Sequence, residues 1–271
     1  MKTWTKILLY TLCTAFALIV VLPFLMMILG SVKNARESAL FGLDLPTEYA
    51  WDNYGKVLSK ASVIRGFLNT IFISLATVIL TDIAAAMAAF VIQRRPGRAS
   101  RVSYYLLLVG LVMPVSIIPT IKLMMSLGIH NSYSGLILYF TAVNLSFAVF
   151  LIAGFMGSVP KELDEAAIVE GSSYTRLFFK IILPLLKTVI VTNTIITVLA
   201  VWDDFFGPFY LVSNSKKWTI VMSMYTFVSQ YQTNWGLVFA FMMLMILPML
   251  LMYFFLQRFI IEGITAGSVK G

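Results

Sequence analysis

The stretch GSVPKELDEAAIVEGSSYTRLFFKIILP, residues 157–184, is polar at its start and lies between two long apolar runs. Ser158 is a suitable N-cap, and Pro160 suits the first turn of a helix. The acidic residues near that start, where the helix dipole favours negative charge, are Glu162, Asp164 and Glu165. Gly171 is placed to end the helix in a left-handed conformation. We therefore expect a helix of about three turns between Ser158 and Gly171.

One face of this predicted helix is built mainly from small residues. Leu163, Ala167 and Gly171 lie four residues apart and share that face, with Ala166 beside them. Alanine and glycine let another protein approach closely, and Glu165 on a neighbouring face offers a carboxylate to a basic partner. The other interpretation is a plain connecting loop at the membrane surface. These physical features alone leave both interpretations open.

The composition identifies the solvent. Of 271 residues, 60% are hydrophobic and 12% are charged, against about 25% charged in soluble domains. A chain this apolar belongs in lipid, where roughly 20 apolar residues cross the bilayer as a helix. Six runs are long enough to do so, at residues 7–29, 67–92, 103–125, 136–155, 183–201 and 237–257. A second short helix, residues 174–184, is expected to lead into the fifth run, with a bend at Pro184.

We therefore predict an all-α membrane protein with six transmembrane helices. Its predicted parts are an N-terminal transmembrane helix (1–32), an extracytoplasmic loop (33–66), a core (67–258) that contains the loop 157–184, and a cytoplasmic tail (259–271). The chain has one cysteine, Cys13, and one histidine, His130. These counts exclude a disulfide framework and a metal site built from cysteine or histidine clusters. We expect no metal and no cofactor on this chain.

The basic residues predict the orientation. The turn Gln93–Arg101 carries four arginines in nine residues, and short loops with excess Lys and Arg stay in the cytoplasm. Both termini are then cytoplasmic. The formal net charge of +8 is accounted for by this distribution and implies no nucleic-acid partner.

The loop 157–184 also resembles a known pattern, the EAA motif of ATP-binding-cassette (ABC) importer permeases. The positions that carry the resemblance are Glu165, Ala166, Ala167, Gly171, Ile181, Leu183 and Pro184. The end of the chain, residues 262–271, is similar to the tail of permeases of the maltose-type carbohydrate uptake family. The resemblance covers the whole chain.

This resemblance implies a type I ABC importer permease fold with a cytoplasmic coupling helix. It assigns contact with the ATPase to Glu165, Ala166, Ala167 and Gly171, together with Leu183 and Pro184 at the end of the motif. The tail at Thr265–Lys270 is also expected to reach the ATPase. The chain has no Gly-x-x-x-x-Gly-Lys-Ser/Thr loop, so ATP and Mg²⁺ are expected on a separate ATPase dimer.

The resemblance further implies the rest of an importer in a bacterial cytoplasmic membrane. The expected partners are a second, different permease, the ATPase dimer and an extracytoplasmic solute-binding protein that contacts the loop 212–235. The expected substrate is a sugar, most simply an oligosaccharide. A polyol or glycerol phosphate is the alternative substrate.

Polar residues inside the predicted spans are candidates for the substrate pathway. Asp82 lies near the middle of the second span, where it serves either the pathway and its gate or a contact between helices. Asn144, Asn193 and Thr197 could bind sugar hydroxyls, with Trp202 or Tyr139 as an aromatic platform. Their other interpretation is hydrogen bonding between helices.

Two further classes of protein fit a chain this apolar less well. An ion-coupled carrier would use Asp82 as its coupling group, but the chain shows no inverted repeat. An intramembrane enzyme would need a catalytic constellation that one histidine and one cysteine do not provide. The sequence favours a transport subunit over both.

Overall fold

The computed structural model describes residues 3–228 and 233–268, with side chains described for residues 4–228 and 233–257. Within these residues every regular element is a helix, as predicted. The chain divides into two compact units, Met1–Arg65 with Met222–Leu250, and Gly66–Val221 with Leu251–Gly271. The predicted ATPase contact at Thr265–Lys270 lies outside the described side chains.

The first unit contains α1 (Thr3–Ser31), α2 (Ala35–Ser38), α3 (Asp52–Leu58) and the first residues of α4 (Ala61–Arg94). It also contains the 3₁₀ turn Met224–Thr226 and the first half of α14 (Trp235–Ser268). The buried Asn53 side chain donates hydrogen bonds to the carbonyl oxygens of Ser31 and Lys33, both at 2.9 Å. The segment 33–66, predicted as a loop, thus contains two short helices and the start of α4.

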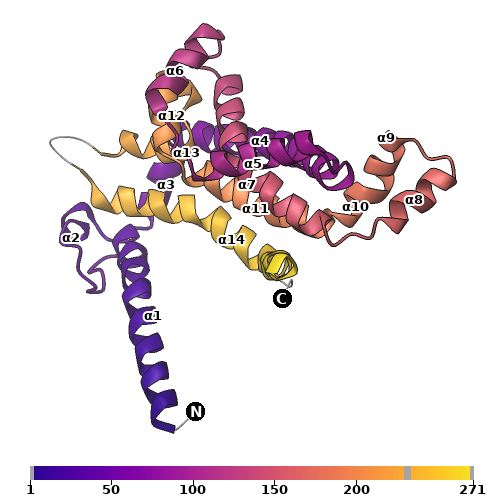
Figure 1. The fold of residues 1–271 in the computed structure, drawn as a ribbon. Helices are drawn as coiled ribbons and strands as arrows, with labels where there is room; N and C mark the ends of the chain where they lie inside the picture. The colour runs from indigo at the N-terminus through magenta and orange to yellow at the C-terminus, as the bar shows by residue number, and fades with distance from the viewer. Residues whose placement is uncertain (1–2, 229–232, 269–271) are drawn as a thin grey trace. The chain divides into compact units, whose positions relative to one another are not determined.

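The second unit contains most of the remaining helices (Figure 1). Their bounds are α5 (Arg98–Val112), α6 (Ile117–Ser126), α7 (Tyr133–Met156), α8 (Glu162–Val169), α9 (Tyr174–Leu177), α10 (Leu183–Leu185), α11 (Lys187–Asp203) and α12 (Phe206–Leu211). A π-helical turn, η1 (Phe178–Ile182), joins α9 to α10. A 3₁₀ turn, η2 (Ser215–Lys217), follows α12, and the short helix α13 (Ile220–Ser223) lies where the two units meet in sequence.

Four described helices are long and apolar enough to cross a bilayer. They are Trp4–Ser31, Ala61–Arg94, Tyr133–Met156 and Trp235–Gln257. A fifth span exists if Tyr174–Leu185 and Lys187–Asp203, which are bent by 74°, are counted as one. These helices fit the predicted multi-pass membrane class, but the described residues do not form six continuous spans.

The third predicted span, residues 103–125, is not one helix. α5 ends at Val112, and the backbone is extended at Met113 (φ −72°, ψ 128°) before α6 begins at Ile117. Pro114 explains the break, because proline lacks a backbone N–H and forces the residue before it out of the helical region. Pro119 lies in the first turn of α6, where the missing donor is not needed.

The core of the second unit forms where α4, α7 and α11 meet. Its buried members on α4 and α7 are mostly small: Ala85, Ala89, Ala148, Val149, Ile152, Ala153 and Met156. Small side chains let membrane helices approach closely. The same cluster includes Ala167 of α8 and Leu177 of α9, so the segment after α7 folds back against the ends of the long helices.

Candidate functional site

The helix predicted in the loop 157–184 is present as α8, but it begins later than expected. Ser158 is not its N-cap: its hydroxyl donates to the carbonyl oxygen of Phe155 at 2.7 Å, within the last turn of α7. The N-cap position is Lys161, which makes no side-chain cap. The reason is that α7 is followed by turns at Ser158 and Val159, which leave α8 to start beyond Pro160. The three acidic residues still occupy its first turn, as predicted.

Gly171 ends α8 as predicted. Its φ is +80°, and its N–H donates to the carbonyl oxygen of Ile168 at 2.9 Å. The N–H of Ser172 donates to the carbonyl oxygen of Ala167, also at 2.9 Å. These two bonds form a Schellman motif, in which a left-handed residue closes the last turn of a helix.

The predicted small-residue face of α8 is only partly buried: Leu163, Ala166 and Gly171 are exposed, whereas Ala167 is not. Ala167 is 5% exposed and packs in the core cluster with Met156 and Leu177. Glu165 and Ala166 are exposed, and Val169 is 87% exposed. The side chain of Ala167 therefore does not face outward in this conformation, because it closes the contact between α8 and its own chain. Its assignment to the ATPase contact stays a prediction.

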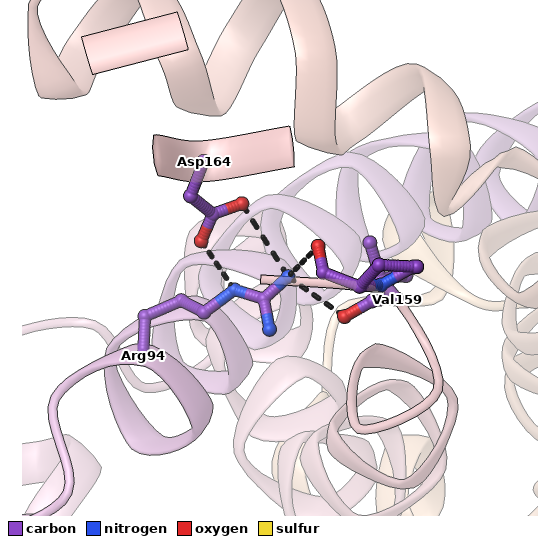
Figure 2. A network of polar contacts seen from close by, with 4 residues as sticks. Arg94, Val159 and Asp164 are labelled. Atoms are coloured by element: carbon purple, nitrogen blue, oxygen red, sulfur yellow. Dashed lines mark hydrogen bonds and ion pairs between the residues drawn. The ribbon is translucent and has the colours of Figure 1, made fainter. Parts of the chain in front are cut away.

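Arg94, the last residue of α4, holds α8 in place (Figure 2). Its Nε lies 2.6 Å from Oδ2 of Asp164 in an ion pair, with only 8% and 12% of the two side chains exposed. Its Nη2 donates to Oδ1 of Asp164 at 3.4 Å, to the carbonyl oxygen of Val159 at 3.1 Å and to that of Pro160 at 3.5 Å. One guanidinium thus binds the segment that enters α8 and the first turn of α8.

The residues on either side of Arg94 hold the neighbouring elements. Gln93 donates through Nε2 to the carbonyl oxygen of Ala153 in α7 at 2.9 Å. The guanidinium of Arg95 lies over the ring of Tyr174, the first residue of α9, at 5.3 Å from its centroid. Sequence reasoning treated these arginines only as markers of orientation. One sequence feature could have predicted the contact between Arg94 and α8: an acidic loop and an arginine-rich helix end are predicted on the same side of the membrane.

The predicted bend at the start of the fifth span is confirmed. The chain passes from η1 through α10 to Leu186, and α11 leaves at 74°. Leu183 and Pro184 lie in α10, and together with Asp82 they line an open groove of about 340 Å³. They are therefore beside α4 rather than on the exposed surface of α8. Figure 1 shows α8, α9 and α10 together at one end of the second unit.

Asp82 makes a contact between helices. Its Oδ1 accepts a hydrogen bond from Nδ2 of Asn193 at 2.6 Å, and its Oδ2 accepts one from the hydroxyl of Thr194 at 2.7 Å. Asn193 is 1% exposed, and its Nδ2 also lies 3.5 Å from the hydroxyl oxygen of Thr197. Of the two interpretations of Asp82, the interhelical contact is the one the structure contains. Thr194 was not predicted, because its role depends on how α4 and α11 pack.

Of the four candidate sugar-binding residues besides Tyr139, the structure brings only Asn193 and Thr197 into contact. Asn193 and Thr197 are buried within the chain. Trp202 is 5% exposed and meets Phe67 edge to face, with ring centroids 5.4 Å apart. Asn144 donates to the carbonyl oxygen of Phe140 in its own helix at 2.8 Å. In this conformation these four side chains serve packing within the chain.

A groove of about 600 Å³ lies beside the broken third span instead. It is formed by α5, α6, α7 and the segments that join them, and its lining includes Met113 and Val115 from the break. Its polar members include Thr120, Tyr139 and Ser146. Irregular backbone at membrane depth is tolerated only where it is buried in protein or lines a water-filled cavity. The sequence analysis predicted a membrane span here but no groove.

Bilayer-length apolar helices, such as the four among the described residues, are typical of a multi-pass membrane protein. The chain belongs to the family described as "Binding-protein-dependent transport system inner membrane component", whose sequence model matches residues 83–265. The resemblance drawn from the loop 157–184 is thereby confirmed at the level of the family.

Individual relatives extend the similarity over nearly the whole chain. The chain is 30% identical to the probable starch degradation products transport system permease protein AmyC of Thermoanaerobacterium thermosulfurigenes, covering 98% of this chain and 97% of the relative. It is 31% identical to the multiple sugar-binding transport system permease protein MsmG of Streptococcus mutans, covering 96% of each. It is 29% identical to the diacetylchitobiose uptake system permease protein NgcG of Streptomyces coelicolor, covering 96% and 88%.

Solved structures show the same fold. A bacterial ABC transporter involved in the import of the acidic polysaccharide alginate has a chain that superimposes with a TM-score of 0.83 at 20% identity, covering 94% of this chain and 95% of that one. A second structure, of an alginate ABC transporter in complex with an alginate pentasaccharide-bound periplasmic protein, matches with a TM-score of 0.66 at 15% identity. The chain therefore has the fold of an ABC importer permease.

Proposed function

We propose that this chain is the permease subunit of an ABC importer for an oligosaccharide and forms half of the translocation pathway. The observation that carries the proposal is the similarity to sugar permeases along nearly the full length of both chains. The named sugars of these relatives differ from one another, so the class of solute is proposed rather than a single sugar. A polyol or glycerol phosphate is the alternative substrate, and the transport assay must distinguish it from an oligosaccharide.

The proposed topology has six spans and places both termini in the cytoplasm. The spans are α1, α4, the broken pair α5 and α6, α7, the bent segment that ends in α11, and α14. The contact between Arg94 and Asp164 puts the arginine-rich end of α4 and α8 on the same side of the membrane. Excess arginine in a short loop favours the cytoplasmic side. This supports the division into an N-terminal helix (1–32), an outer loop (33–66), a core (67–258) and a cytoplasmic tail (259–271).

In this proposal α8 is the coupling helix that docks on the ATPase. The exposed residues Glu165, Ala166 and Val169 supply its contact surface, and Gly171 closes the helix. Ala167 packs α8 against the core of the second unit and contributes to docking only by fixing where α8 lies. ATP and Mg²⁺ are assigned to a separate ATPase dimer, because the chain lacks the phosphate-binding loop.

The pathway is proposed to run along the broken third span. The groove beside residues 113–116 combines apolar lining with a few hydroxyl groups, which is the usual character of a small-molecule site. A second permease would complete the pathway from the other side. A solute-binding protein would deliver the sugar at the outer surface, where the loop 212–235 is its proposed contact.

Transport by the reconstituted complex tests the proposal. The chain is incorporated into liposomes with its companion permease, ATPase and binding protein, and uptake of labelled oligosaccharide, polyol and glycerol phosphate is measured. We expect ATP-dependent uptake of the oligosaccharide alone. A matched complex with an ATPase that cannot hydrolyse ATP should be inactive. Uptake driven by a proton gradient without ATP would contradict the proposal.

A further inference from the structure

We infer that Arg94 is the joint that couples α8 to α4, so that movement of α8 is transmitted to the second span directly. The inference rests on the proposed role of α8 as the coupling helix. It names a positioning residue outside the motif that was recognised in the sequence.

α8 cannot hold its own position. It has eight residues, and isolated helices shorter than about 12–15 residues are marginal in water. Tertiary contacts must therefore decide where it lies. Its buried apolar contact is made through Ala167, and hydrophobic contacts are non-directional. The ion pair between Arg94 and Asp164 is directional.

The guanidinium group of Arg94 has a geometry that can bind several acceptors at once. Arginine presents five N–H groups in a planar, rigid fork, so several acceptors can be fixed at once. Here the acceptors are the Asp164 carboxylate in the first turn of α8 and the carbonyl oxygens of Val159 and Pro160 just before it. Both the entry to α8 and its first turn are thus bound to the end of α4 (Figure 2). A rotation of α8 must either move α4 or break these contacts.

Two routes lead from α8 into the membrane. The route along the chain passes through α9, the π-helical turn η1, α10 and the break at Leu186 before α11 begins at 74°. The route through Arg94 enters α4, a continuous helix of 34 residues with no proline in its sequence. Twelve residues earlier on α4, Asp82 is hydrogen-bonded to Asn193 and Thr194 of α11. Movement that enters at Arg94 therefore reaches both helices.

The test uses the complete transporter with R94Q, R94K and D164N, and with R98Q as the matched control. Arg98 lies in the same basic turn but its side chain is exposed. The measured quantity is the ratio of ATPase activity with sugar-loaded binding protein to activity without it, per assembled complex. We expect R94Q and D164N to lower this ratio by roughly 2- to 30-fold, the range for residues that carry coupling between sites. R94K should fall between them and the wild type, because lysine keeps the charge without the fork. R98Q should match the wild type.

A distance measurement separates transmission from a merely structural role. Spin labels are placed at V91C on α4 and E170C after α8, in a C13S background, since Cys13 is the only native cysteine. Between the resting and the nucleotide-trapped states this distance should stay constant in the wild type and change in R94Q. The double variant R94D/D164R should recover part of the lost ratio.

The outcomes are distinguishable. A normal activity ratio in R94Q, or a distance that changes equally in R94Q and the wild type, would overturn the inference. Loss of ATPase binding in R94Q would also overturn it, because Arg94 would then be required to form the docking surface. If the wild-type complex itself showed no ATP-driven uptake, the proposed function would fail instead.

Discussion

Replacing Gly171 with alanine tests how much one backbone conformation contributes to the stability of the last turn of α8. The residue has a φ of +80°, and a Cβ atom built on it meets no other atom within 4 Å. The substitution therefore introduces no steric clash with the rest of the chain. Its cost is the strain of an L-residue in the left-handed region, roughly 1–2 kcal/mol.

This cost falls on the last turn of α8. The Schellman bonds from the N–H groups of Gly171 and Ser172 depend on the left-handed residue, whereas the first turn is held separately by Arg94. A loss of 1–2 kcal/mol corresponds to roughly a 5- to 30-fold change in an equilibrium. We expect local opening of this turn to become more frequent by that factor. G171N is the matched control, because asparagine tolerates the left-handed region better than alanine does.

Hydrogen exchange of the backbone amides measures the effect. In G171A the amides of residues 171 and 172 should exchange roughly 5- to 30-fold faster than in the wild type. In G171N the acceleration should be clearly smaller, and amides in α7 should be unchanged in both variants. Equal protection of residues 171 and 172 in G171A and the wild type would show that the turn does not depend on the left-handed residue.

Two other substitutions test the assignments on α8 and α4. Ala166→Leu should weaken ATPase binding, measured by co-purification, and leave the melting temperature of the isolated permease unchanged. Ala167→Leu should lower that melting temperature in detergent, because the side chain it enlarges is buried. Equal melting temperatures for the two variants would refute the assignment. Asp82→Leu removes the acceptor of two hydrogen bonds and should destabilise the permease by about 1–3 kcal/mol for each donor left unsatisfied. Asp82→Asn, which keeps an acceptor oxygen, should melt closer to the wild type, and the opposite order would refute the contact.

Features of the site that depend on neighbouring residues in sequence were predictable. Gly171 was assigned correctly because the need for a left-handed residue at a helix end is local, and glycine satisfies it at no steric cost. The acidic first turn of α8 and the bend near Pro184 were predicted for the same reason. Family membership followed from the spacing of these local features.

Features that depend on packing were not predictable. Ser158 is as good an N-cap as any, but the turns that follow α7 use its hydroxyl for α7 instead. The pattern of α8 could not show which side of the helix is buried, because Leu163 and Ala167 both lie on its predicted apolar face and only Ala167 is enclosed. The partners of Arg94 lie 65 to 70 residues away and those of Asp82 more than 100, at positions that only the helix packing brings near.

The first helix has a consequence for how sequence change is tolerated. Every described side chain from Trp4 to Leu25 is exposed within this chain. Along that length α1 therefore makes no close packing contact in its own unit that a substitution could disturb. Exchange among leucine, isoleucine, valine and phenylalanine there changes neither a cavity nor a close contact. A charged residue near its middle would instead meet the cost of insertion, about 2.5–3.5 kcal/mol. Selection on this segment should therefore act on its hydrophobicity and length rather than on its shape.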